Sequence, residues 1–314
     1  MKEYIIGKNE AGQRFDKYIF KLLKNAGTGL IFKQLRNKNI VLNGKKAKGN
    51  EILKENDSVR IFMSDDTINK FTGGPLHISK TGFRLDVIYE DDDILLASKP
   101  VGVLSQKSSD KDISMNEYLI EYLTDNGFGK ENLATFKPSF CNRLDRNTSG
   151  LMIAGKSLRG LQKMSEIIKD RSIHKFYLTI VKGIVDKKSV IKGYLRKDEK
   201  NNKVVIYDNP VKDSYEIHTE YEPLATKDDM TLLKVRLITG KTHQIRAHLA
   251  GIAHPVLGDF KYGDKAFNEK YGEKNQLLHS YQVVFPKLDD FPDISEKSFN
   301  TPYPVNFTKY FKEN

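Results

Sequence analysis

Strand-like and helix-like patterns interleave along this sequence without the regular strand–helix alternation of a doubly wound parallel sheet. Residues 231–240 alternate like a strand, with Leu233, Val235 and Leu237 on one side. Residues 241–254 follow directly and read as a short helix with an inward apolar face. This irregular order favours a mixed sheet with helices packed against it. We therefore predict the α+β fold class.

A stretch without sustained periodicity, residues 64–83, divides the chain into two parts. It is punctuated by Gly73, Gly74 and Pro75, which is typical of an interdomain linker. The 314 residues are enough for two domains. We predict an N-terminal domain over residues 1–63, a linker over 64–85 and a larger domain over 86–314.

The positive charge of the chain is concentrated in the first of these parts. The formal net charge is +11, and residues 1–63 hold 14 lysines and arginines against six acidic residues. Between Arg14 and Lys48, ten basic residues accompany a single acid, Asp16. A merely solvated surface normally mixes both signs, so this excess favours a polyanionic partner. No apolar stretch approaches the roughly 18 residues of a membrane-spanning helix, and we expect no membrane insertion.

The basic residues of the N-terminal part follow a helical pattern. Over residues 14–24 apolar side chains take one face and basic side chains the opposite one. A second short helix is predicted over residues 30–38, followed by two strands joined at Asn43 and Gly44. The candidate contacts to a polyanion are Arg14, Lys17, Lys21, Lys24, Lys33, Arg36, Lys45 and Lys46.

Residues 12–62 resemble the alpha-L RNA-binding fold, the type found in ribosomal protein S-four. The resemblance is carried by "GQRFDKYI", "IFKQLRNKNIVLNGKKAK" and "LKENDSVRIF", in this order. It implies a small module of two helices and a short sheet that grips the RNA backbone through the basic residues named above.

Several other kinds of site are not supported by the sequence. The stretch 238–244 imitates a phosphate loop, but Val235 stands where the first glycine is required. A zinc site at His243, His248 and His254 lacks a carboxylate or thiol, and Arg246 lies among them. No serine lies in a nucleophile elbow. We predict no metal site and no nucleoside triphosphate site.

Cys141 is the single cysteine of the chain. A disulfide within the chain is therefore impossible, and we expect this thiol to be a small buried hydrophobe without a catalytic role. The N-terminus lacks the apolar core of a signal peptide. We predict a cytoplasmic protein.

Asp145 is the remaining candidate for chemistry. It lies between Arg143 and Arg146, immediately before a turn over residues 147–150 and an apolar run. A carboxylate can act as nucleophile or base toward the anomeric carbon of a sugar, provided that it stays ionised. A paired arginine favours the ionised form, and we expect that partner from elsewhere in the fold. A surface salt-bridge cluster is the alternative interpretation.

Five stretches, in order over residues 85–286, resemble the RluA/RluC/RluD-type pseudouridine synthases of ribosomal and transfer RNA. Two departures from the family pattern are visible: Asn142 replaces a histidine, and Lys241 replaces an arginine. The stretches are "LDVIYEDDDILLASKPVGVLS", "NRLDRNTSGLMIAGKS", "HKFYLTIVKG", "GKTHQIRAHLAGIAHPVLGDFKYG" and "LLHSYQVVFP".

The resemblance implies an isomerase that converts uridine within RNA to pseudouridine. By this resemblance Asp145 is the catalytic residue, Arg246 its partner and Tyr177 the aromatic side chain that packs on the uracil ring. Arg143 matches the arginine that fills the space left by the flipped base, and Leu278 is expected in the apolar wall. No net oxidation, group transfer or hydrolysis occurs, so no cofactor is implied.

The resemblance favours large-subunit ribosomal RNA as the substrate. We also expect the protein to be a monomer. Transfer RNA is the alternative substrate. A non-catalytic RNA-binding protein would be expected to lack Asp145, Tyr177 or Arg246, and all three are present. An enzyme acting on free nucleosides would not need the extended basic surface of the N-terminal part.

Overall fold

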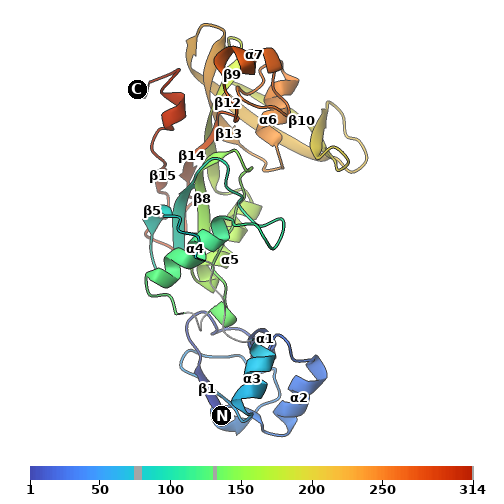
Figure 1. Ribbon diagram of the computed structural model, residues 1–314, viewed down its shortest axis with the longest axis vertical. Helices are drawn as coiled ribbons and strands as arrows, with labels where there is room; N and C mark the ends of the chain where they lie inside the picture. Colours follow the sequence, from blue (N-terminus) through green and yellow to red (C-terminus); the bar gives the residue numbers. More distant parts are fainter. Residues whose placement is uncertain (74–79, 130–132, 313–314) are drawn as a thin grey trace.

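The computed structural model describes residues 1–73, 80–129 and 133–312. A small N-terminal unit lies at one end of the molecule, and a long twisted sheet with its helices makes up the rest (Figure 1). No helix among these residues has both the length and the apolar composition needed to cross a membrane. The mixed sheet with packed helices confirms the predicted α+β class.

The N-terminal unit packs helices on a four-stranded sheet of order β1-β4-β2-β3. Its apolar core includes Phe15, Ile19, Leu35 and Ile61, each at most 1% exposed. The helices are α1 (Phe15–Leu22), α2 (Thr28–Arg36) and α3 (Asp65–Thr72), and the strands are β1 (Lys2–Ile5), β2 (Ile40–Leu42), β3 (Lys45–Lys46) and β4 (Ser58–Ile61).

Much of the predicted linker belongs to the two folded parts, so its boundaries were wrong. Helix α3 begins where Ser64 accepts a hydrogen bond from the Thr67 amide, and its Ile68 lies in the N-terminal core. This short, polar helix has a single buried residue, which hid its periodicity. At the other end, Leu85 is buried in the core of the large part. Residues 74–79 of the predicted linker lie outside the described residues, and the division into two domains stays a prediction.

The large part is built on one mixed sheet of order β11-β10-β12-β13-β9-β14-β8-β6-β5. The β14–β8 pair is parallel, and the other pairs along this path are antiparallel. The strands are β5 (Asp86–Glu90), β6 (Ile94–Lys99), β8 (Ser149–Gly155), β9 (His174–Lys182), β10 (Ser189–Asp198), β11 (Lys203–Tyr207), β12 (Tyr215–Lys227), β13 (Met230–Leu237) and β14 (Leu278–Val284), with β7 (Ser139–Phe140) beside β8 and β15 (Ser298–Asn300) beside β14.

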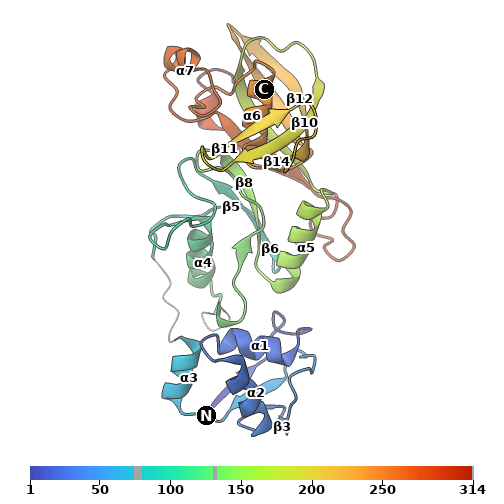
Figure 2. The ribbon, with the colours of Figure 1, turned by 90° about the vertical axis from the view of Figure 1, so that its right-hand side faces the viewer.

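Strict alternation in β6 and β8 places helices on both faces of the sheet. Leu95 and Ala97 join the core beneath α4 (Met115–Asp125), whereas Ile94 and Leu96 join the core beneath α5 (Leu158–Lys169). Figure 2 shows the two helices on opposite sides of these strands. Ser114 and Glu117 form a capping box at α4, and Ser157 caps α5.

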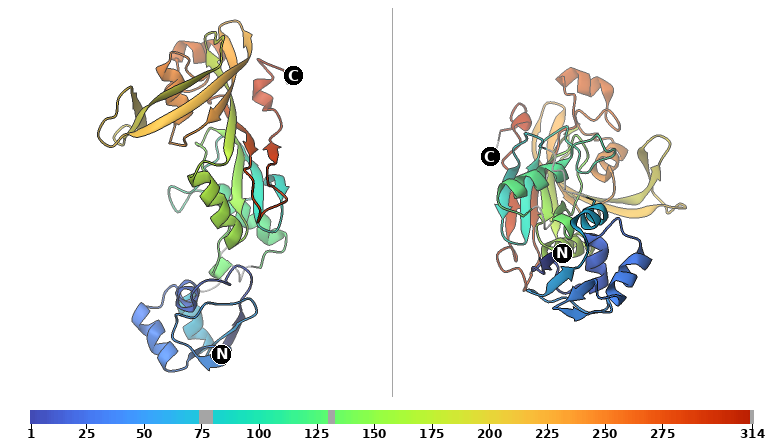
Figure 3. Two further views of the ribbon diagram at one scale, coloured as in Figure 1. Left: turned by 180° about the vertical axis from the view of Figure 1, so that it is seen from behind. Right: turned by 60° about the horizontal axis from the view of Figure 1, so that its bottom comes forward.

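The other half of the sheet carries α6 (Gln244–Gly251) on one face and the C-terminal segment with α7 (Lys265–Tyr271) on the other. The 3₁₀ turn η2 (Val305–Phe307) buries Phe307 against Leu178 and Ile180 of β9. The hairpin of β10 and β11 projects away from the body of the molecule (Figures 1 and 3).

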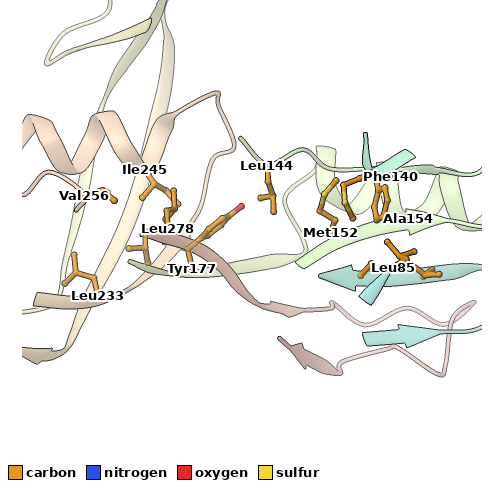
Figure 4. Close-up of a cluster of buried hydrophobic side chains, with 14 of the residues drawn as sticks. Leu85, Phe140, Leu144, Met152, Ala154, Tyr177, Leu233, Ile245, Val256 and Leu278 are labelled. Carbon is orange, nitrogen blue, oxygen red and sulfur yellow. The ribbon is translucent and has the colours of Figure 1, made fainter. Parts of the chain in front are cut away.

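The apolar cluster beneath α4 and α6 is continuous across both halves of the sheet (Figure 4). Gly150, at the start of β8, permits the close parallel approach of β14. Its φ is +106°, and a Cβ there would lie 2.1 Å from the carbonyl oxygen of Ser280. Any other residue would force the two strands apart, and with them the loop that precedes β8.

Candidate active site

The loop that carries Asp145 is fixed by hydrogen bonds with the side chains of Asn142 and the buried Ser105. Asn142 Oδ1 accepts from the Ile153 amide at 2.8 Å, which holds the start of the loop against β8. Ser105 Oγ donates to the Leu144 carbonyl at 2.8 Å and accepts from the Leu144 amide at 2.9 Å. The Asp145 carbonyl accepts from the Thr148 amide at 3.0 Å, closing the turn. The carboxylate is therefore presented from a rigid support.

Lys99 supports this loop from below. Its ammonium donates to the carbonyls of Pro100, Val103 and Arg146 at 2.7–2.9 Å. The side chain is only 1% exposed, and burial lowers the pKa of Lys99 to about 7. The three carbonyls supply the hydrogen bonds that a buried ammonium requires.

Arg246 on α6 reaches Asp145 across a sequence separation of about a hundred residues. Its Nη1 donates to Asp145 Oδ2 at 2.7 Å. Its Nε and Nη2 bind the two carboxylate oxygens of Asp259 at 2.7 and 2.9 Å. Burial alone would lower the pKa of Arg246, but the two carboxylates outweigh it and raise that pKa. The guanidinium thus stays charged and bridges two acids, one of them fully buried.

Tyr177 and Leu278 form an apolar wall beside this ion pair. Tyr177 on β9 is 5% exposed, and burial raises the pKa of its hydroxyl to about 12, so the phenol is neutral at physiological pH. Its ring lies near Leu278, and its hydroxyl points toward Leu144 (Figure 4). The wall offers a flat aromatic face within reach of Asp145.

A cleft of about 700 Å³ opens above these residues. Among the described residues, Asp145 is the one acidic side chain in its lining. The cations of the lining are Lys107, Arg143, Lys175, Lys241 and Arg246. An anionic molecule is therefore favoured in this cleft.

His243 and Tyr262 are site residues that the sequence did not identify as a pair with Asp145. His243 Nε2 lies 3.8 Å from Asp145 Oδ2, and its Nδ1 shares a 2.9 Å hydrogen bond with the Tyr262 hydroxyl. Burial lowers the pKa of His243, which favours the neutral imidazole. Its backbone has a left-handed φ of 55°, a conformation that the periodicity of α6 does not reveal.

The remaining predicted residues are Arg143 and the basic residues of the N-terminal unit. Arg143 lines the cleft and is exposed, and it makes no hydrogen bond or ion pair within the described ranges. The eight basic candidates of the N-terminal unit are all exposed. Arg14 and Lys24, predicted as parts of the first helix, flank α1 as its N-cap and a position beyond its end. Arg14 also binds Asp16 at 2.6 Å.

The two departures from the family pattern have local partners. Asn142 holds the loop as described above. Lys241 Nζ lies 3.7 Å from the centre of the Tyr215 ring, a cation–π contact at the mouth of the cleft. Neither replacement removes an ion-pair partner of Asp145, because those partners are Arg246 and His243.

The alternatives to carboxylate chemistry gain no support from the geometry. Cys141 is half-buried, and burial raises the pKa of its thiol to about 11, so it is protonated at neutral pH. His248 contacts Thr219, and His254 contacts the Lys182 carbonyl, so neither converges with His243. The described part of the chain holds no group of three or more metal-binding side chains.

Comparisons with known proteins agree with the resemblance seen in the sequence motifs. Residues 93–251 match the family model described as RNA pseudouridylate synthase. An RNA pseudouridine synthase of Mycoplasma genitalium, named as uncharacterized, is 31% identical over 304 residues, covering 94% of this chain and 93% of that protein. Ribosomal large subunit pseudouridine synthase C of Pasteurella multocida is 28% identical over 295 residues, covering 91% and 86%.

A solved structure shares the fold. The structure titled human RNA pseudouridylate synthase domain containing 4 has a TM-score of 0.58 at 20% identity and covers 71% of this chain and 90% of that chain.

Proposed function

The chain belongs to the RNA pseudouridylate synthase family, of the RluA/RluC type, and is an RNA pseudouridine synthase, and we propose that it acts on specific uridines of large-subunit ribosomal RNA. The relatives named ribosomal large subunit pseudouridine synthase C support this choice of RNA. Transfer RNA is the alternative, and neither the cleft nor the fold distinguishes the two.

We assign the chemistry to Asp145. The bond from ribose carbon 1′ to uracil nitrogen 1 breaks, the base turns, carbon 5 bonds to carbon 1′, and the carbon 5 proton is released as nitrogen 1 gains one. A carboxylate assists either as nucleophile at carbon 1′ or as base at the 2′ carbon, and both roles require the ionised form. The ion pair with Arg246 at 2.7 Å supports that form.

The other residues suit a base taken out of its stack. Extruding a uridine costs a few kcal/mol, which contacts in the cleft and in the vacated space must offset. Tyr177 and Leu278 offer an apolar surface to the uracil ring. Arg143, exposed and unpaired among the described residues, is free to enter the vacated space and contact phosphate.

The N-terminal unit is proposed to bind RNA as an alpha-L module. Helices α1 and α2 and the small sheet support this proposal, with α3 as an additional helix of the unit. Its eight exposed cations supply sequence-independent attraction to phosphate. An enzyme for free nucleosides has no use for this surface. A cytoplasmic location and a monomeric state stay predictions of the sequence.

The observation that carries the proposal is the buried Arg246 bridging Asp145 to Asp259 beneath a cation-lined cleft. It is tested by mapping pseudouridine at nucleotide resolution in large-subunit ribosomal RNA and transfer RNA from cells with and without the protein. We expect one or more ribosomal sites to vanish and to return only with the active gene. Loss of pseudouridine confined to transfer RNA would show that transfer RNA, and not ribosomal RNA, is the substrate. No loss in either RNA would contradict the proposal.

A further inference from the structure

Lys175 is a lysine in the cleft wall for which the part of the chain that the structure describes supplies no anion. It lies on β9 two residues before Tyr177, so both side chains point from the same face of the strand into the cleft. Phe176 between them points the other way, where Lys234 lies over its ring.

Apolar residues lie along the methylene chain of Lys175, and its ammonium group faces the cleft. Its partner on β14 is Val283, and Leu237, the residue after the Arg236 partner of Phe176 on β13, lines the same cleft. The ammonium extends over Gly240, where a Cβ would lie 3.6 Å from Nζ. Glycine at this position therefore places only backbone beside the ammonium.

No described residue accepts a hydrogen bond from Lys175 or forms an ion pair with it. Arg143 is likewise unpaired among the described residues, but it is exposed to solvent. The remaining cations of the cleft have partners: Arg246 holds two carboxylates, Lys107 lies 3.5 Å from Glu117, and Lys241 covers the Tyr215 ring. Burial, together with the nearby charge of Arg171, lowers the pKa of Lys175. A partly buried cation without a counterion is unfavourable for the free protein.

We infer that Lys175 binds a backbone phosphate of the RNA strand, next to the uridine that occupies the cleft. This rests on the proposed function only in taking RNA as the occupant. The phosphate supplies the missing counterion, and the contact forms only in the complex. Because Lys175 and Tyr177 share one strand face, this contact would fix the nucleotide beside the aromatic wall. Lys175 is thus a binding and positioning residue.

The test compares wild type with Lys175→Met, Lys175→Arg and a charge-matched control, Lys187→Met, which removes an exposed cation in the connection between β9 and β10. Equilibrium binding to one unmodified large-subunit ribosomal RNA transcript is measured at several salt concentrations. Tritium release from the same transcript, labelled at uracil carbon 5, gives kcat and KM.

We expect Lys175→Met to weaken RNA binding and raise KM about tenfold at low salt, with kcat within about threefold, and to reduce the slope of log affinity against log salt by about 0.7. Lys175→Arg should keep the wild-type slope, and Lys187→Met should change affinity less than about twofold. Methionine keeps the apolar stem, so the melting temperature of the free protein should stay equal or rise.

An unchanged salt slope for Lys175→Met would overturn the inference, even if KM rose. A fall in melting temperature beyond about 5 °C would also overturn it, because the lysine would then serve the fold. Failure of the proposed function is a separate result: wild type would release no tritium, and the binding titrations would still decide the role of Lys175.

Discussion

Asp259 holds Arg246 by two hydrogen bonds, 2.7 Å to Nε and 2.9 Å to Nη2, and leaves Nη1 to point at the cleft. The carboxylate of Asp259 is fully buried, and its own pKa is lowered because the guanidinium outweighs the effect of burial. A fixed guanidinium orients the carboxylate of Asp145 without a rearrangement during the reaction. Asp259 thus acts on the chemistry through Arg246.

Asp259→Asn should lower both activity and stability. The amide keeps the shape but leaves Arg246 without its buried counterion, which costs about 3 kcal/mol of unfolding free energy. We expect kcat to fall at least about tenfold, equivalent to about 1.4 kcal/mol in the barrier. Urea unfolding and single-turnover tritium release measure the two effects. Wild-type kcat in this variant would show that Asp259 does not orient Arg246.

Arg246→Lys should be almost as damaging as Arg246→Met. A lysine retains the charge but lacks the planar fork that contacts two carboxylates at once. We expect kcat at least about tenfold below wild type for both variants, with RNA affinity nearly unchanged. Kinetics and filter binding on the same transcript check this. A lysine variant with full activity would show that charge alone suffices.

The protein should lose stability as the pH falls from about 6.5 to about 4, and His279 should account for part of that loss. This imidazole lies between Ser149 and Thr301, and burial lowers its pKa to about 4. Below pH 6.5, His279 therefore binds a proton in the unfolded chain, whereas in the folded chain it stays neutral until the pH approaches 4. Protonation of His279 thus favours unfolding. The integrated effect is about 3 kcal/mol.

His279→Asn should flatten this part of the stability profile. His243 and His248, whose pKa values are also lowered by burial, should leave a residual slope of the same sign. Urea unfolding of wild type and variant between pH 4 and 8 provides the comparison. Identical slopes would mean that His279 does not titrate differently in the folded chain.

The N-terminal cations should set much of the salt dependence of RNA binding. Replacing four of them in the full-length chain removes up to four phosphate contacts, each worth 0.7–0.9 in the slope of log affinity against log salt. We expect the slope to fall by about 3. The four substitutions are Lys17→Gln, Lys21→Gln, Lys33→Gln and Arg36→Gln.

A control with the same charge loss uses exposed lysines of the large part. It should change the slope much less, and kcat at saturating RNA should stay close to wild type in both proteins. Equal slopes of log affinity against log salt for the two quadruple variants would contradict the proposal that the N-terminal unit binds the RNA backbone. The control substitutions are Lys187→Gln, Lys227→Gln, Lys265→Gln and Lys287→Gln.

Sequence patterns predicted the elements that bury a regular apolar face, such as α1 and β13, because periodicity records burial directly. They missed α3, whose single buried residue, Ile68, gives no repeat. In the site, resemblance pointed to Asp145, Tyr177 and Arg246. The supporting contacts of Asp259, His243 and Lys99 arise from chain segments far apart in sequence, and no local pattern encodes such contacts.

The central claim is that Asp145 carries the isomerisation, and Asp145→Asn tests it most directly. Tritium release from RNA labelled at uracil carbon 5 is measured beside equilibrium binding of the same RNA, with the exposed Asp208→Asn as control. We predict that release by Asp145→Asn falls at least about 100-fold while its affinity stays within about twofold, and that the control matches wild type. Release within about tenfold of wild type would contradict the account, because the amide can neither attack carbon 1′ nor accept a proton from carbon 2′.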